Sequence, residues 1–423
     1  MLHRNVLIVG NGAREHALAW KLRQSSRVDR LFCAPGNGGT SAIAENVPIA
    51  ANQIDSLVAW SGQNEIGLVV VGPEEPLALG LVDRLTERGI LAFGPKAAAA
   101  RIESSKKWAK SLMVEAKVPT ASYATFDAAP AAWDYARGQQ YPLVLKADGL
   151  AAGKGVVIAT TPDEARAAIE AALEARAFGE AGQTLVIEEF MVGEELSLLA
   201  FVDGRTVVPL VPARDHKRVG DEDRGPNTGG MGAIAPSHVA DRFGVDRLAS
   251  MILAPVANAL VDRGIPYHGV LYAGLMFTAD GPKVVEFNCR LGDPETQVLL
   301  PLLDEDLTDL IEATAAGQLS PRTPRMKSGY RCGVVLASEG YPGAYPSGLR
   351  IDGLDRVDDT ALVFHAGTKR VNDAIFTAGG RVLTVVGQGE TLGAARRHAY
   401  GNVERIHFAG AHYRRDIGLR EVR

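Results

Sequence analysis

The sequence predicts a multidomain protein of mixed α/β and α+β class. We expect an N-terminal domain built on a parallel sheet, a central core carrying a small subdomain, and a mainly β C-terminal domain. Apolar strands alternate with amphipathic helices over residues 1–100, and these strands are continuously apolar. That pattern is typical of a parallel sheet buried on both faces. The chain of 423 residues is also too long for a single hydrophobic core.

Four strands are expected in the N-terminal domain, at Asn5–Val9, Arg30–Ala34, Ile66–Val71 and Ile90–Phe93. An amphipathic helix at Ala13–Gln24 follows the first of them. All four strands run into a glycine-containing turn. Ligands of open parallel sheets bind beyond the carboxyl ends of the strands. These turns are therefore where we expect a substrate.

The pattern beyond residue 100 predicts two further domains. We place the domains at residues 1–103, 104–320 and 328–423, with a small lid subdomain at about 121–187. The stretch 317–328, rich in Pro, Ser and basic residues, is interpreted as a linker. Inside the lid, Thr161 and the acids after it predict a capped helix. The other expected elements are helices at 101–120, 243–263, 303–317 and 391–405, and strands at Thr184–Ile187, 270–277 and 282–288.

Composition excludes several classes of protein. The net charge of −5 argues against nucleic acid as the main partner, and no apolar run is long enough to span a membrane. The three cysteines are widely spaced, which fits a reducing compartment and gives no zinc motif. The first residues run directly into a strand, which leaves no room for a signal peptide. We therefore expect a cytoplasmic protein.

The most informative segment is 146–159, KADGLAAGKGVVIA. It places Lys146 at the end of one strand and Lys154 in a glycine-rich loop that contains Gly153, before a second strand. Glycines allow backbone N–H groups to approach phosphate oxygens, and lysines supply positive charge. The segment is not a Walker A loop, because the spacing of its glycines and the final Ser/Thr are wrong. We interpret it as a flap over a polyphosphate; a flexible glycine hairpin is the alternative.

The turn Gly10-Asn11-Gly12 follows the first strand and opens a helix carrying Arg14 and Glu15. A dinucleotide fingerprint would have a third glycine where Glu15 stands, and an acid at the end of the second strand. Both are missing, which argues against NAD. A helix N-terminus beside an arginine still suits a phosphate-bearing substrate. A purely structural turn is the alternative.

Strand 282–288 predicts a metal site. Glu286 and Asn288 are two residues apart and share a face of the strand. Both offer oxygen ligands of the kind that Mg²⁺ uses together with substrate phosphates. Arg290 and Asp293 follow at once, and Arg290 can hold a carboxylate or phosphoryl group through two hydrogen bonds. Cys289 is interpreted as a small buried residue, and the alternative for the whole stretch is a solvated strand face.

Two other polar stretches are weaker signals. Residues 187–191, IEEFM, followed by Glu195, are similar to a purine clamp, although acids at strand ends are common. The stretch from Asp215 to Gly232 is polar and rich in glycine, and ordered loops of this length are uncommon unless they are functional. A disordered surface loop is the alternative.

Taken together, the motifs resemble those of the phosphoribosylamine–glycine ligases, a family of the ATP-grasp superfamily. The matching segments are GNGAREHAL, APGN, VGPEEPL, KADGLAAGKGV, VIEEFMVGEE, DHKRVGDEDRGPNTGGMGA, GVLYAGLMF, VEFNCRLGDPETQ and FHAGTK, and they span about residues 3–418. The resemblance implies an ATP-grasp fold with a lid. It also implies that glycine is activated by ATP as glycyl phosphate and captured by 5-phosphoribosylamine, the second step of purine synthesis. The match ends with the ligase, so a stand-alone enzyme is expected.

The resemblance also implies roles for individual residues. Arg290, Lys154 and Asp293 would act on the reacting groups, with Arg290 on the glycine carboxylate and Asp293 on its ammonium. Glu286 and Asn288 would hold Mg²⁺ or Mn²⁺. ATP would be bound by Lys106, Lys146, Gly153, Lys154, Glu188, Glu189, Phe190, Met191 and Glu195. The substrates would contact Gly10, Gly12, Arg14, Glu15, Pro73, Glu74, Asp215, Lys217, Arg290, Gly292 and Asp293.

Two departures from the family pattern stand out. Ser104-Ser105 precedes Lys106 where the family often has Gly-Ser, and Leu271–Phe277 contains no acid that could complete a second metal site. The competing hypotheses are another ATP-grasp carboxylate–amine ligase or carboxylase of purine metabolism, and a non-catalytic nucleotide-binding module. We expect a monomer. Transient contact with the upstream amidotransferase is a hypothesis based on the lability of phosphoribosylamine.

Overall fold

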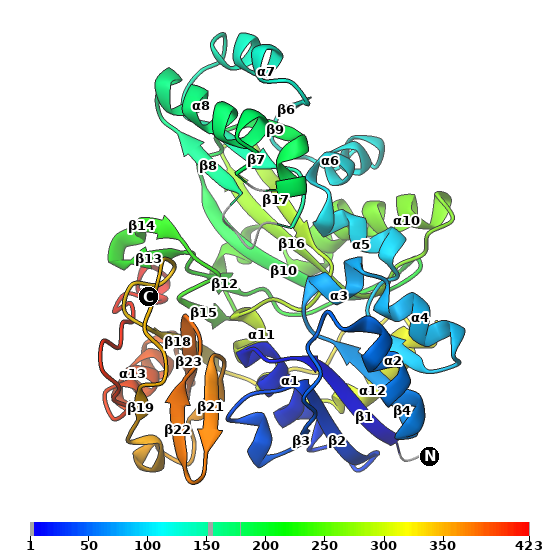
Figure 1. Ribbon diagram of the computed structural model, residues 1–423, viewed down its shortest axis with the longest axis vertical. Helices are drawn as coiled ribbons and strands as arrows, with labels where there is room; N and C mark the ends of the chain where they lie inside the picture. The colour runs from blue at the N-terminus through cyan, green and yellow to red at the C-terminus, as the bar shows by residue number, and fades with distance from the viewer. Residues whose placement is uncertain (1–3, 151–154, 178, 423) are drawn as a thin grey trace.

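The computed structural model describes residues 4–150, 155–177 and 179–422. Figure 1 shows a central region with the lid above it and the N-terminal and C-terminal domains side by side below. Within the described residues, no helix has the length and apolar character needed to cross a bilayer.

The N-terminal domain is a parallel sheet with strand order β3-β2-β1-β4-β5. Apolar side chains cover both faces of β1 and β4, as the continuous apolar runs predicted. The predicted strands and helix are confirmed to within a few residues. The elements are β1 (Arg4–Gly10), α1 (Ala13–Leu22), β2 (Val28–Pro35), β3 (Glu45–Asn46), α2 (Ile54–Gln63), β4 (Ile66–Val71), α3 (Glu74–Ala78), α4 (Leu81–Glu87) and β5 (Leu91–Phe93).

The expected helix at 101–120 is wrong as a single element. The structure has two helices, α5 (Ala97–Ser104) and α6 (Lys106–Glu115), which meet at Ser105. Ser105 has extended backbone angles, and its Oγ accepts a hydrogen bond from the N–H of Trp108 at 3.1 Å. A serine that caps a new helix in this way ends the previous one. The break places Lys106 at the first position of α6.

The lid is an antiparallel sheet of order β6-β9-β7-β8 with two helices on it. The predicted cap is confirmed, since the Thr161 Oγ accepts from the N–H of Glu164. The apolar core of the lid is separate from the core beneath it. Its elements are β6 (Tyr123–Phe126), α7 (Ala129–Ala136), β7 (Leu143–Ala147), β8 (Val156–Ala159), α8 (Pro162–Ile169) and β9 (Leu185–Glu189).

The central sheet has the order β11-β10-β16-β17, and its core is continuous with one face of the N-terminal sheet. The expected helix at 243–263 is helical from Val245 to Asp262, with a π-helical turn at Ala249–Leu253 just before Pro255, which lacks a backbone donor. The elements are β10 (Glu194–Asp203), β11 (Thr206–Pro209), α9 (Val245–Leu248), α10 (Ala254–Asp262), β16 (His268–Thr278), β17 (Gly281–Asn288), α11 (Glu295–Leu299) and α12 (Leu307–Ala315).

The C-terminal sheet combines segments from both sides of the expected linker. Its order is β12-β15-β18-β23-β20, so β12 pairs with β15, and β15 in turn pairs with β18, which follows residue 329. This pairing ties the glycine-rich stretch to the C-terminal domain. The elements are β12 (Arg214–Asp215), β13 (Arg218–Gly220), β14 (Arg224–Asn227), β15 (Gly232–Ala235), β18 (Tyr330–Ala337), β19 (Arg350–Ile351), β20 (Leu362–His365), β21 (Thr368–Val371), β22 (Ala374–Thr377), β23 (Arg381–Gly389) and α13 (Leu392–Val403).

Candidate active site

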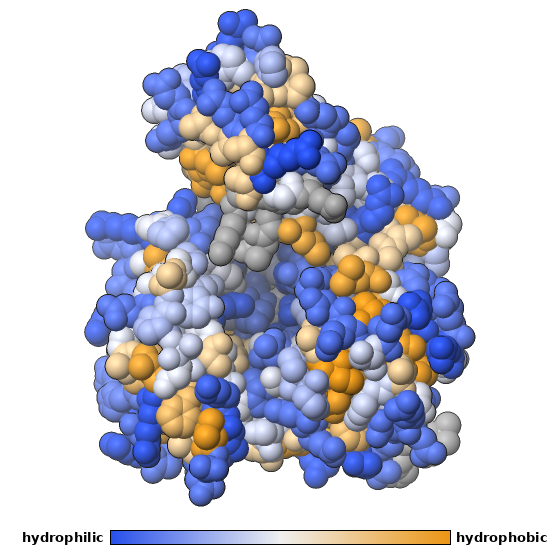
Figure 2. Space-filling view, viewed as in Figure 1, coloured by the Kyte–Doolittle hydropathy of each residue, from blue (hydrophilic) through white to orange (hydrophobic). Residues whose placement is uncertain are grey.

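Two adjoining cavities lie between the lid, the central sheet and the C-terminal sheet. The first has a volume of about 490 Å³ and the second of about 380 Å³. Both are lined by Lys146, Glu188, Asp215, Lys217 and Glu286, so they share one wall. Figure 2 shows a hydrophilic recess at this place, between the lid and the two lower domains.

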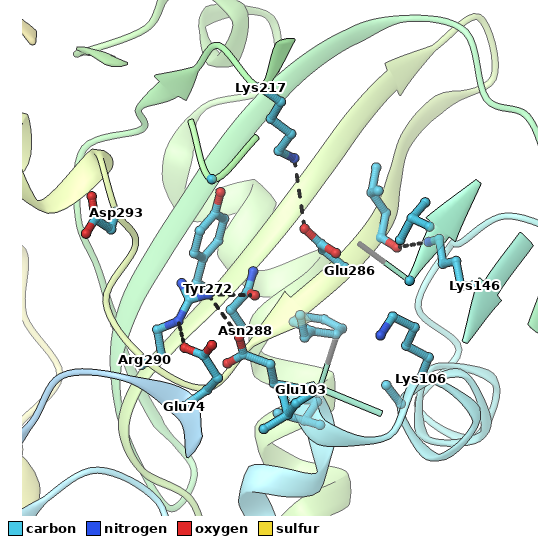
Figure 3. A pocket seen from close by; sticks show the side chains of 18 of the residues that line it. Glu74, Glu103, Lys106, Lys146, Lys217, Tyr272, Glu286, Asn288, Arg290 and Asp293 are labelled. Carbon is cyan, nitrogen blue, oxygen red and sulfur yellow. Dashed lines mark hydrogen bonds and ion pairs between the residues drawn. The ribbon is translucent and has the colours of Figure 1, made fainter. Parts of the chain in front are cut away.

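Most of the sequence-predicted site residues meet in the first cavity. They come from the N-terminal turns, from α6, from β7 and from β17 with the loop after it, as Figure 3 shows for ten of the lining residues. The predicted residues that line it are Arg14, Pro73, Glu74, Lys106, Lys146, Glu188, Asp215, Lys217, Glu286, Asn288, Arg290 and Asp293. Elements far apart in the chain thus converge on one space.

The second cavity contains the predicted purine clamp. Apolar side chains of the lid strands lie on one side and those of the central sheet on the other, which suits a flat heteroaromatic ring. The predicted residues here are Glu188, Glu189, Phe190, Met191 and Glu195, and the apolar lining is Val144, Val156, Ile158, Met276 and Val285.

Two predicted lysines line the first cavity, and Lys146 lines the second as well. Lys146, at the end of β7, is buried, and its Nζ lies 2.9 Å from Glu188 Oε2 and donates to the carbonyl of Val285 at 3.1 Å. Lys106 donates to the carbonyl of Gly149 at 2.9 Å, and burial lowers its pKa. The predicted residues Gly153 and Lys154 lie outside the described residues.

Glu286 and Asn288 both line the first cavity, and Phe287 between them, which also borders it, packs in the core and is 3% exposed. Burial alone would raise the pKa of Glu286, but Lys217 and, beyond it, Lys146 hold that pKa below its ordinary value. An ionised carboxylate beside an amide oxygen fits Mg²⁺, which keeps several waters and takes few protein ligands. Within the described residues no group of three or more His, Cys, Asp or Glu forms a complete metal cage. Glu286 and Asn288 supply two oxygen donors of the kind that Mg²⁺ uses together with substrate phosphates.

Arg290 is fixed between two carboxylates. Its Nη2 lies 2.9 Å from Glu103 Oε1 and its Nε 3.3 Å from Glu74 Oε2, and Nη2 also donates to Asn288 Oδ1 at 3.2 Å. Burial raises the pKa of Glu103, although Arg290 opposes this shift. Cys289 is buried, which confirms its interpretation as a small core residue, and its N–H donates to Glu103 at 2.7 Å.

Asp293 is held from the C-terminal domain. Arg381, on β23, places Nη1 3.3 Å from Asp293 Oδ1 and donates to the carbonyls of Asp293 and Gly229. Burial alone would raise the pKa of Asp293, but Arg381 brings that pKa below its usual range. Gly292, the residue before it, has no room for a side chain because a Cβ there would lie 2.3 Å from Glu295 Oε2.

The N-terminal turn is organised around Glu15. Its carboxylate accepts from the N–H of Gly12 at 2.6 Å and from Arg14 Nε at 2.6 Å, and its side chain is buried. A Cβ at Gly10 would lie 2.6 Å from Glu15 Cδ, so this close approach requires glycine there. Glu15 therefore orients Arg14, which reaches the first cavity, and is not itself among the residues that line it.

Lys217 lies on the wall between the cavities. Its Nζ is 3.4 Å from Glu195 Oε2 and 4.0 Å from Glu286 Oε1. Burial raises the pKa of the neighbouring Asp215 to about 7 against the effect of Lys217. Glu195 and Lys217, which the resemblance assigns to different ligands, are thus partners here.

The predicted site residues leave out four charged residues that line the first cavity: Glu103, Lys110, Glu295 and Arg381. Lys110 lies four residues after Lys106 and so on the same face of α6, a spacing that could have indicated it. Glu103 was visible only as one acid in a helical stretch. Arg381 comes from a distant strand, and nothing in its local sequence marks it.

Family models and curated relatives match nearly the whole chain. Three models of the phosphoribosylglycinamide synthetase family match consecutive parts of the chain: the N domain at residues 4–103, the ATP-grasp (A) domain at 104–296 and the C domain at 331–420. A phosphoribosylamine–glycine ligase of Halalkalibacterium halodurans is 49% identical, with 99% of this chain and 97% of the relative covered. One of Nostoc sp. is 50% identical, with 98% and 99% covered.

Solved structures show the same fold. The phosphoribosylamine–glycine ligase of Thermotoga maritima superposes with a TM-score of 0.85 at 34% identity, covering 98% of this chain and 100% of that one. A biotin carboxylase domain from Hydrogenobacter thermophilus, solved with MgADP, shares the fold with a TM-score of 0.74 at 17% identity, covering 98% and 92%. Since the family models match most of the chain and the relatives match nearly all of it, the chain belongs to the phosphoribosylglycinamide synthetase family.

Proposed function

We infer that the protein joins glycine to 5-phosphoribosylamine with ATP, giving glycinamide ribonucleotide, ADP and phosphate. This reaction is the second step of purine biosynthesis. The observation that carries the inference is the pair of cavities that share Lys146, Lys217 and Glu286. One cavity suits a purine base, and the other combines phosphate-binding lysines with charged groups of both signs.

In the proposed reaction, a glycine carboxylate oxygen attacks the γ-phosphorus of ATP, and the bond to the β-phosphate oxygen breaks. The phosphoribosylamine nitrogen then attacks the glycyl carbonyl carbon and loses a proton, and phosphate leaves. Phosphoryl transfer depends mainly on positioning and on neutralising charge. Lys106 and Lys146 would supply positive charge in the first cavity, and Lys146 also borders the second.

Arg290 and Asp293 would orient glycine by opposite charges, the guanidinium toward its carboxylate and the carboxylate toward its ammonium. The metal would be held by Glu286 and Asn288, with Mg²⁺ or Mn²⁺ as the ion. When bound, the ion would neutralise phosphate charge and align the triphosphate. The lid would exclude water, which otherwise hydrolyses an acyl phosphate.

The decisive experiment measures phosphate release with Mg²⁺, ATP, glycine and freshly generated phosphoribosylamine. We expect turnover only with the complete mixture, and omission of any one component as control should abolish it. Turnover that does not need glycine would overturn the proposal and favour another ATP-grasp activity. We also propose a monomer and a transient contact with the upstream amidotransferase. A sedimentation measurement and a pull-down test these two points.

A further inference from the structure

A buried cluster of three charges lies beneath the nucleotide cavity. Glu188, on β9, is only 3% exposed, and its Oε2 lies 2.9 Å from Lys146 Nζ and 3.3 Å from Lys110 Nζ. One carboxylate oxygen thus binds two ammonium groups. Two lysines against one glutamate leave a surplus positive charge at this place.

The second oxygen of Glu188 is left free. Among the described residues, Glu188 Oε1 is a buried atom with no hydrogen-bond partner, and Glu188 lines both cavities. A buried acceptor without a partner is costly. The cost is removed when a ligand in the cavity donates a hydrogen bond to that oxygen.

The side chain of Lys110 is buried and has several partners. It lies on α6, 2% exposed, and its Nζ donates to Thr120 Oγ1 at 2.8 Å and lies 5.4 Å from the centre of the Tyr123 ring. Burial lowers its pKa to about 8, with Glu188 opposing and Lys146 adding to the shift. A lysine buried in this way costs folding stability while it stays charged.

We propose that Lys110 is a positioning residue of the nucleotide site. With Lys146 it holds Glu188 Oε2 against the wall of the cavity, so that Oε1 faces the nucleotide. Lys106 lies one turn earlier on the same face of α6, and both lysines line the first cavity; Lys106 donates to the carbonyl of Gly149, whereas Lys110 contacts Glu188. The proposal rests on the proposed ATP site and deepens it.

The test replaces Lys110 by methionine, which keeps the length of the side chain and removes its charge. The matched control is Lys107→Met, because Lys107 is on the same helix and half exposed, and its ammonium group lies 3.8 Å from Asp127 at the surface. ADP affinity is measured by calorimetry with Mg²⁺, together with the unfolding temperature of the unliganded protein. ADP affinity and the unfolding temperature are measured without turnover. They can therefore contradict the proposal for Lys110 even if the proposed reaction is correct, and the reverse also holds.

We expect Lys110→Met to weaken ADP binding and to raise the KM for ATP by about tenfold, the effect of one charge-assisted hydrogen bond. The KM for glycine should change little, and the unfolding temperature should stay the same or rise. Glu188→Gln and the double variant Lys110→Met/Glu188→Gln complete a double-mutant cycle. The effects of the two single substitutions on ADP affinity should not be additive. Unchanged ADP affinity, additive effects, or a loss of binding that follows a lower unfolding temperature would each overturn the proposal.

Discussion

The first cavity has two buried charge clusters of the same form and opposite sign. On the nucleotide side, Glu188 lies between Lys110 and Lys146. On the opposite side, Arg290 lies between Glu74 and Glu103. The first cluster has a surplus positive charge and the second a surplus negative charge. The same arrangement, one ion between two ions of opposite charge, therefore gives the two sides of the cavity surplus charges of opposite sign.

Strand β17 connects the clusters. The carbonyl of Val285 accepts from Lys146, and Asn288 Oδ1 accepts from Arg290. Glu286 lies between these two positions and faces the cavity. A difference in charge across one short strand can orient a triphosphate and a small zwitterion toward each other. Three experiments would break or sharpen this comparison.

The largest effect is expected for Glu286→Ala, which removes the proposed metal ligand between the clusters. Loss of several kcal/mol of charge stabilisation corresponds to about 10³-fold lower turnover. The fold should persist, because Glu286 faces the cavity. Turnover is measured by phosphate release and the fold by circular dichroism. Asp280→Ala, in the exposed turn before β17, is the control, and near-normal activity of Glu286→Ala would remove Glu286 from the metal site.

The next effect is expected for Arg290→Met, which leaves Glu74 and Glu103 without their shared partner. Removing one member of a buried ion pair costs about 3–5 kcal/mol of unfolding free energy. Denaturant unfolding measures it. Adding Glu103→Gln should recover part of the loss, because one stranded charge is then gone. A loss below about 1 kcal/mol for Arg290→Met alone would show that the cluster of Arg290 is not a tightly coupled unit.

The smallest effect is a dependence on pH with opposite sign in the two clusters. Burial lowers the pKa of Lys110 to about 8, below its unfolded value of 10.5. Between these values the unfolded chain binds more protons, so stability rises with pH. Burial raises the pKa of Glu103 above 4.5. In the range just above pH 4.5 the folded chain binds more protons, and stability falls as pH rises.

Difference curves isolate these contributions. The unfolding free energy of the unmodified protein minus that of Lys110→Met should rise by on the order of 2–3 kcal/mol between pH 8 and 10.5. The unfolding free energy of the unmodified protein minus that of Glu103→Gln should fall as pH rises above 4.5. Parallel slopes in the two curves would contradict the opposite charge of the clusters.

Local sequence signals predicted much of the scaffold and the kinds of side chain that line the cavities. Continuous apolar runs gave the parallel strands β1 and β4, and Thr161 gave the start of α8, because these signals are local. The alternation of side chains along β17 likewise placed Glu286 and Asn288 on the cavity face. The sequence analysis did not predict the helix break at Ser105, because the residues on both sides favour a helix and only one capping residue separates them.

Only the tertiary structure decided which charges meet. Arg290 and Glu74 are 216 residues apart, and Arg381 reaches Asp293 from another domain. Lys217 pairs with Glu195 and Glu286 instead of standing alone at the substrate. Such pairs depend on how sheets and helices pack over long separations, and local sequence carries no record of that packing. The motifs therefore predict which residues line the site. The packing of the domains decides which ion pairs they form and what net charge each cluster carries.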